Sequence, residues 1–399
     1  MENQMLRQML FASAITTEHD PDKASRLLAT QIEGQIAGRS LDLALLFLSP
    51  HFRVTAMDIV TNLQEAFKPK VLIGCTGEGV IGREREIERR PAIALVAAHL
   101  PGIELAPFKL QSMDWERRLD DVETVRHMIA APPETKLFML LADPFTTPMD
   151  AVLDAFNSSY PGLPMIGGLA SGSHRAGGNA LLLNNRIVNN GAVGVAFAGE
   201  FEVDIIVSQG CRPIGRPLKV TAVRENIVFS LEGKTPLERI KVLVTELEAE
   251  DQELLQNGLF LGRAIDSSQE TLGRGDFLIR GVMGLDQQSG AMIISDYLDE
   301  GETVQFHVRD AITAEEDLEM MLTPQIFFEP PSGGMLFSCN GRGTRLYNHP
   351  NGDISTIQKV IGNIDLAGFF CAGEIGPIGG KNFLHGHTAS LALFRPMSS

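Results

Sequence analysis

Four short segments combine glycines with side chains that can bind a ligand or react: residues 71–79, 164–172, 335–343 and 369–376. Each starts with apolar residues typical of a buried strand and runs into a loop of glycine and small residues. Glycine lets the backbone take positive φ and lets a ligand approach the main chain. Ligands of open α/β sheets bind beyond the carboxyl ends of strands. One such loop can equally serve a tight turn, but four together favour a binding site.

The first and fourth segments share the pattern Cys-x-Gly-Glu, at residues 75–78 and 371–374. The match is either a trace of duplication or a convergence of loop chemistry. No segment contains the Gly-Lys-Ser/Thr of a Walker A loop, and none fits GxGxxG with a helix behind it. The sequence therefore does not support nucleotide binding.

Arginine and glutamate in these loops suit a ligand that carries both a carboxylate and an ammonium group. Arg342 lies between two glycines, and a guanidinium can hold a carboxylate through two hydrogen bonds. Glu78 and Glu374 are candidates for the ammonium. The alternatives are a structural or solvated role for Arg342 and, for Arg280, pairing with a buried carboxylate. The predicted ligand-binding residues are Cys75, Thr76, Glu78, Arg280, Asn340, Gly341, Arg342, Cys371, Gly373, Glu374 and His385.

Cys371 is the candidate nucleophile of an alternative, enzymatic hypothesis. With His385 or His387 as the base, it would catalyse acyl transfer or hydrolysis. Because buried cysteines are usually inert, ligand binding is favoured over catalysis. On a strand the two histidines would face the same side, but no third metal ligand lies nearby in sequence. We therefore expect neither a metal nor another cofactor.

The first half of the chain alternates short apolar runs with helical patterns, which predicts an α/β layer structure. One helix is expected to begin after Asp20, which is an N-cap before Pro21, and another after a cap at Thr147. Two more are expected at 57–67 and 115–129, where apolar residues recur at helical spacing. The charged run of residues 83–90 is interpreted as a solvated surface. Near-continuous apolar strands, of the kind buried on both faces, are expected at 43–48, 71–75, 92–98, 137–142, 165–168 and 192–198.

The second half begins with a predicted helix whose capping box is Thr235 and Glu238. An antiparallel meander and further α+β elements follow. We therefore predict an α/β to α+β protein of two domains, 1–225 and 226–399, each a largely buried mixed β-sheet flanked by helices. The expected meander strands are 277–284, 291–295 and 303–308; the later elements are helices 314–322 and 354–361 and strands 334–339 and 368–371.

Composition limits the classes of function. The chain has 399 residues, 44% of them hydrophobic and 21% charged, which is typical of a folded globular protein. Its net charge of −16 argues against nucleic acid or an anionic membrane as the main partner. Four cysteines without a CxxC pair are too few for a disulfide framework, so a reducing cytoplasm is expected. Residues 1–17 do not form a signal peptide, and the longest uncharged stretch, 155–173, contains prolines and glycines that exclude a membrane span.

The carboxyl-terminal run, Gly368 to Gly380 followed by Phe383 to Ser390, resembles the end of the FIST family in the form with linked N- and C-terminal FIST domains. The resemblance extends from about Leu41 onward. Matching stretches are 73–79, 166–170, 210–215, 276–280, 309–310 and 340–343.

This resemblance implies an intracellular sensory module for small ligands, with amino acids suggested as the ligand class. Relatives often carry signalling output domains or an F-box, but here both halves are taken up by the two FIST domains. The resemblance therefore implies output through a separate signalling protein. A protein-interaction scaffold without a ligand remains a further alternative.

Overall fold

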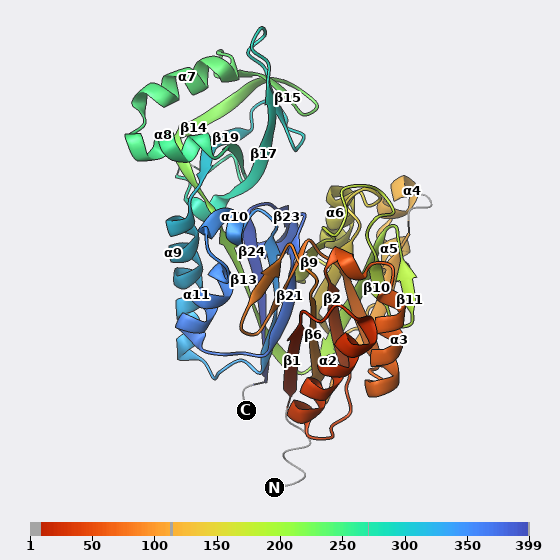
Figure 1. The fold of residues 1–399 in the computed structure, drawn as a ribbon. Coiled ribbons are helices and arrows are strands. Elements are labelled where there is room, and N and C mark those ends of the chain that lie inside the picture. Colours follow the sequence, from red (N-terminus) through yellow and green to blue (C-terminus); the bar gives the residue numbers. More distant parts are fainter. Residues whose placement is uncertain (1–8, 112–114, 270, 398–399) are drawn as a thin grey trace. The chain divides into compact units, whose positions relative to one another are not determined.

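The computed structural model describes residues 9–111, 115–269 and 271–397, and it has a mixed α/β fold as predicted (Figure 1). Residues 1–8, which belong to the segment 1–17 considered above as a signal peptide, lie outside this description. The chain divides into two compact units. The first contains the described residues up to Val207, Leu318–Leu384 and those from Thr388 onward; the second contains Ser208–Asp317 and His385–His387. The expected domain boundary at 225/226 falls within the second unit, because that unit is an insertion.

Three six-stranded sheets build the first unit. The first has the order β1 (Leu10–Thr16), β6 (Ile93–His99), β2 (Leu43–Leu48), β3 (Val71–Thr76), β10 (Leu181–Leu183), β11 (Arg186–Val188). The second has the order β7 (Ile103–Leu110), β12 (Ala192–Gly199), β8 (Thr135–Ala142), β9 (Met165–Leu169), β22 (Glu374–Ile378), β23 (Lys381–His385). The third has the order β13 (Phe201–Gln209), β24 (Thr388–Pro396), β20 (Gly333–Cys339), β21 (Leu366–Cys371), β4 (Gly79–Gly82), β5 (Glu86–Glu88).

The three sheets follow one plan. In each, a parallel pair (β2–β3, β8–β9 or β20–β21) has an antiparallel neighbour beside its first strand (β6, β12 or β24). The far edge is completed by a hairpin from elsewhere in the chain: β10–β11 pairs with β3, β22–β23 lies beside β9, and β4–β5 pairs with β21. The first unit is therefore a threefold repeat in which each repeat contributes one hairpin to the sheet of another. The first repeat contributes to the third sheet, the second repeat to the first sheet, and the third repeat to the second sheet.

One glycine in each repeat marks the position at which the three repeats can be aligned with one another. Gly74, Gly167 and Gly368 lie opposite a leucine of the parallel partner strand, and a Cβ atom would lie only 1.6–1.9 Å from that leucine's carbonyl oxygen. In this alignment Cys75 is one residue after its glycine, whereas Cys371 is three residues after. The shared Cys-x-Gly-Glu pattern is therefore offset by two residues and is not the trace of this repeat.

Replacing Gly368 with alanine should cost about 3 kcal/mol of the free energy of unfolding, because the new methyl group would meet the Leu336 backbone at 1.6 Å. Gly34 is the control: it lies in a helix with nothing within 4 Å of its Cβ position, so Gly34→Ala should stabilise by about 0.5–1 kcal/mol. Urea unfolding of the two variants checks both values. Equal effects would show that the close approach at Gly368 relaxes freely.

Alternating strand residues separate two kinds of core. Phe47, Met139 and Phe337 belong to an inner cluster shared by all three sheets. Leu46 instead packs with α2 (Pro21–Ile36) and α3 (Ala56–Phe67), which cover the outer face of the first sheet (Figure 1). The outer cluster of the second sheet includes residues of α4 (Trp115–Leu119), α5 (Val122–Ile129) and α6 (Met149–Ser159), and that of the third includes residues of α9 (Ala311–Leu322) and α11 (Gly352–Ile361).

Local capping signals were partly correct. The Asp20 side chain caps α2 by accepting from the Lys23 amide, as predicted. The predicted cap at Thr147 is wrong: its hydroxyl donates to the Gly191 carbonyl, and Pro148 occupies the N-cap of α6 without a side-chain bond. Among the described residues, no helix combines the length and apolar character needed to cross a bilayer.

The second unit contains a closed antiparallel barrel, inserted between β13 and β20 of the third repeat. The three predicted meander strands are present within it, but only the first two pair with each other; strand 303–308 pairs elsewhere in the barrel, so the predicted meander order is wrong. The predicted Thr235–Glu238 capping box begins α7 (Pro236–Glu246), which precedes α8 (Ala249–Gln256). The barrel order is β14 (Cys211–Arg224), β15 (Ile227–Leu231), β18 (Met292–Ile294), β17 (Phe277–Leu285), β16 (Leu259–Ala264), β19 (Thr303–Arg309).

Candidate functional site

The four glycine-rich loops predicted from the sequence meet in the first unit. We call residues 75–79, 168–172, 339–343 and 371–374 the central loop cluster. The Ser171 hydroxyl accepts from the Glu78 amide at 2.8 Å and donates to the Phe370 carbonyl, so this one side chain joins all three repeats. Backbone hydrogen bonds complete the junction: Gly172 to Thr76, Leu169 to Gly373, Ala372 to Leu169 and Asn340 to Cys371.

Arg342 is fully enclosed within this cluster, with a relative exposure of 1%. Its Nε and Nη2 donate to the Asp353 carboxylate, at 2.6 Å for the shortest contact, and Nη2 also donates to the Tyr347 hydroxyl at 2.6 Å. The third guanidinium nitrogen, Nη1, is buried without a hydrogen-bond partner. The side chain thus has a structural ion pair on one edge and a free donor on the other.

Asp353 stabilises this buried cation. Burial alone would raise the pKa of Asp353, but the Arg342 charge and hydrogen bonds from Arg342, Ser338 and Tyr347 hold that pKa below its usual value. Burial also raises the pKa of the Tyr347 hydroxyl, which donates to Asp353 at 2.8 Å. An ionised pair inside a neutral shell is therefore the expected state near neutral pH.

Glu374 begins β22 and has no exposed surface. Its Oε2 accepts from the Thr388 amide at 3.2 Å and the Thr388 hydroxyl at 2.8 Å, while Oε1 is buried without a partner. Burial raises the pKa of Glu374 to about 8, although Thr388 and the Arg342 charge oppose the rise. Two unsatisfied polar atoms, Arg342 Nη1 and Glu374 Oε1, therefore belong to one cluster, and such atoms are uncommon in native interiors.

Glu78 and Asn340 have partners in the cluster or directly after it. The Glu78 carboxylate binds Arg345 through two contacts of 2.5 and 3.0 Å, and Arg345 also donates to the Asn340 carbonyl at 2.7 Å. The Asn340 amide and the Gly341 amide donate to Cys371 O and Cys339 Sγ, respectively. Thr76 Oγ1 accepts from the Ala180 amide at 3.0 Å, and Gly373 has the positive φ of 156° that favours glycine.

All four cysteines are thiols outside any disulfide, and Cys75 and Cys371 are completely buried. Burial, and for Cys371 the neighbouring Glu374, raises both thiol pKa values well above the usual value. Gly168 lies against Cys371, since a Cβ on that glycine would be 2.6 Å from Sγ. The thiolate needed for nucleophilic attack is disfavoured in this environment.

Three predicted site residues belong to the second unit. Arg280 Nε donates to the Asp296 carboxylate at 2.6 Å, and both side chains are mostly buried, as in the ion-pair alternative. His385 ends β23, and His387 follows it in a turn with φ of 60° and its ring against Phe260. The two histidines are therefore not consecutive same-side residues of one strand.

Sequence reasoning missed Asp353, Tyr347 and Glu86. The solvated interpretation of the run at 83–90 is wrong for Glu86, which is 6% exposed in β5, accepts from the Ile354 amide at 2.9 Å and leaves Oε2 unpaired. Burial, then Asp353, raises its pKa to about 8. Alternating charges along a short strand resemble a surface pattern, and only the pairing of β5 with β4 at the third sheet's edge reveals the burial.

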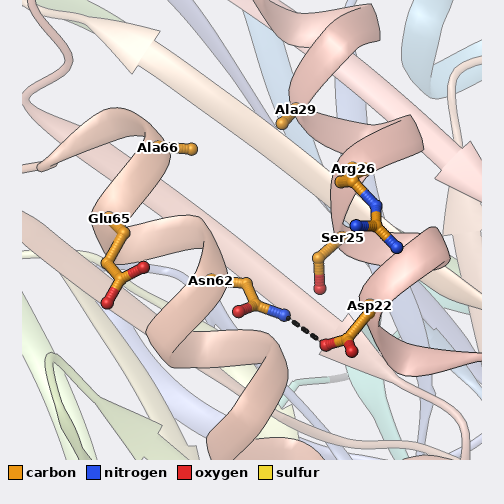
Figure 2. A pocket seen from close by; sticks show the side chains of 7 residues that line it. All are labelled: Asp22, Ser25, Arg26, Ala29, Asn62, Glu65 and Ala66. Carbon is orange, nitrogen blue, oxygen red and sulfur yellow. Dashed lines mark hydrogen bonds between the residues drawn. The ribbon is translucent and has the colours of Figure 1, made fainter.

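The described residues contain no group of three or more His, Cys, Asp or Glu side chains arranged to hold a metal ion. A hollow of about 530 Å³ lies elsewhere in the first unit, between α2 and α3 (Figure 2). Across it, the Asn62 amide donates to Asp22 at 3.0 Å. Its lining shares no residue with the central loop cluster.

Comparisons with known proteins cover nearly the whole chain. The FIST N domain model matches residues 42–234, and the FIST C domain model matches residues 236–377. Uncharacterized protein Rv0628c of Mycobacterium tuberculosis (strain ATCC 25618 / H37Rv) is 37% identical over 97% of this chain and 100% of its own length. Uncharacterized protein Mb0898c of Mycobacterium bovis is 35% identical over 97% of this chain and 99% of its own.

A solved structure, the cyanuric acid hydrolase of A. caulinodans, aligns over 98% of this chain and 100% of its own at 9% identity, with a TM-score of 0.34. That score is too low to support an argument about fold or function. The family models, in contrast, match the two halves in order and meet near residue 235, and the full-length relatives agree in extent. The chain therefore belongs to the FIST family and contains both its N and its C domain.

Proposed function

We propose that this protein is a small-ligand-binding sensory protein whose ligand occupies the central loop cluster. FIST domains are generally taken as small-ligand sensory domains. The observation that supports this location is the pair of buried, unsatisfied polar atoms, Arg342 Nη1 and Glu374 Oε1, among glycine-rich loops. A ligand that satisfies both would recover the free energy lost by leaving them unpaired.

The ligand class proposed first is a carboxylate-bearing metabolite such as an amino acid. Arg342 keeps one free N–H edge after pairing with Asp353, and this edge suits a carboxylate oxygen. Glu78, Thr76, Asn340 and the Gly341 and Gly373 backbone lie in the same cluster and are proposed as further contacts. Arg280 and His385, in the second unit, stay predictions from the sequence.

Binding is favoured over the enzymatic alternative because the Cys371 thiol is buried and its pKa is raised, which removes the nucleophilic form. We further propose that the protein acts in the cytoplasm and passes its state to a separate signalling protein. The negative net charge is consistent with a partner other than nucleic acid.

A thermal-shift screen with the twenty amino acids tests the binding function. At a concentration a hundred times its Kd, a true ligand stabilises the folded state by about 2.7 kcal/mol, which raises Tm by several degrees. Arg342→Lys keeps the charge but loses the planar donor edge, so the shift should disappear. Arg186→Lys, at an exposed strand residue, should respond like the wild type. A shift that survives in Arg342→Lys would place the ligand elsewhere.

A further inference from the structure

The two oxygens of Glu374 have different environments. Oε2 accepts two hydrogen bonds from Thr388, whereas Oε1 accepts none. A carboxyl proton on Oε2 would compete with both Thr388 donors, so a neutral Glu374 carries its proton on Oε1. The unsatisfied atom is then an O–H donor rather than an acceptor.

Burial favours this neutral form, whereas Thr388, Arg342 and Cys339 oppose it only in part. Thr388 faces it from β24, Cys371 and Cys339 from the ends of β21 and β20, and Arg342 from the loop after β20. Of these, Arg342 alone is charged near neutral pH, and its guanidinium is already bound to Asp353. Among the described residues, no cation forms an ion pair with Glu374. With its pKa raised to about 8, the buried acid keeps its proton at pH 7.

We propose that Glu374 recognises its ligand as a neutral hydrogen-bond donor, so that Arg342 and Glu374 together select oxygen acceptors of an organic acid and not an ammonium group. This inference rests on the proposed function and narrows its ligand class. The ligand needs a carboxylate or a comparable pair of oxygens, and an α-amino group adds nothing at Glu374. From the sequence, Glu374 was expected to accept from an ammonium group; in this inference it instead donates to an oxygen of the ligand.

The opposite roles predict opposite responses to pH. As a donor, Glu374 loses its function and adds a repelling charge when it ionises, so the affinity for a carboxylate should fall about tenfold between pH 7 and pH 9. As a partner for an ammonium group, it would have to release its proton on binding, so the affinity would rise over the same range.

Isothermal titration of the full chain with matched probes separates the two roles. The probes are alanine, glutamate and phenylalanine, the corresponding acids without an amino group (propionate, glutarate and 3-phenylpropionate), and propylamine. We expect an acid to bind within threefold of its amino acid, propylamine not to bind, and the acid's affinity to fall tenfold from pH 7 to pH 9.

The variant Glu374→Gln retains an N–H donor without a titrating proton. It should therefore bind the same acid at pH 7 within about threefold, and its affinity should be constant to pH 9. Glu33→Gln, at an exposed residue of α2, should keep the tenfold fall. Binding of an amino acid but not its acid, with affinity that rises with pH, would overturn the inference and leave the proposed function intact. Failure of every probe to bind at either pH would reject both.

Discussion

Replacing Arg342 with methionine should lower the free energy of unfolding by about 3–5 kcal/mol. The variant removes the only ionic partner that the structure gives the completely buried Asp353 carboxylate. The remaining Ser338 and Tyr347 hydrogen bonds cannot offset the desolvation of an isolated charge. Urea unfolding followed by fluorescence of Trp115, the chain's single tryptophan, measures the change in the first unit.

Arg345→Met is the matched control, because Arg345 is three residues away and also pairs with a carboxylate, that of Glu78, but this pair is partly exposed. Its loss should cost less than about 1 kcal/mol. The double variant Arg342→Met, Asp353→Leu removes both charges and should recover most of the stability. A cost below 1 kcal/mol for Arg342→Met would show that Asp353 is not held ionised by this arginine.

Glu374 should make the protein less stable as the pH rises. In the folded state its pKa is about 8, against 4.5 for an unburied glutamate, so between these values the folded chain holds a proton that the unfolded chain has released. The free energy of unfolding therefore falls across this window, by about 5 kcal/mol for this one group. The contribution is complete below pH 4.5 and is lost as the pH passes through 8.

Glu374→Gln removes this titration. The difference in unfolding free energy between the variant and the wild type should shift in favour of the variant by about 5 kcal/mol from pH 4.5 to pH 8. Glu86, whose pKa is also raised to about 8, keeps its own pH dependence in both proteins and cancels in the difference. Urea titrations at five pH values, with Glu33→Gln as the exposed control, provide the measurement. A difference independent of pH would mean that Glu374 is ionised in the folded protein.

Local sequence signals predicted a helix or strand well where a single local pattern, such as an apolar run or a capping box, determines it. The six apolar residues of β2 have the predicted bounds, and the Thr235 capping box begins α7 as expected. β7, from Ile103 to Leu110, was missed because it is an edge strand with charged residues and Pro107, so it lacks the continuous apolar run of a central strand.

The long-range pairing was not visible in the sequence. The hairpin containing Val80 completes its sheet against Phe369, and no local pattern links two segments so far apart. For the same reason only part of the candidate site was accessible from the sequence: the loops and Arg342 were proposed from their glycines, whereas Asp353 in α11 has no glycine-rich context. Closure of the barrel likewise depends on the non-local pairs β14–β19 and β16–β19.

The exchanged hairpins have a consequence for the order in which the protein is made. The first repeat supplies β4–β5 to a sheet whose other strands include the last one of the chain, β24. Until β21 has left the ribosome, the hairpin has no edge to join, and pairing over such a distance is slow because the loop-closure entropy comes before the contacts. The central loop cluster contains both residues 75–79 and residues 371–374, so it can be complete only when synthesis is nearly finished.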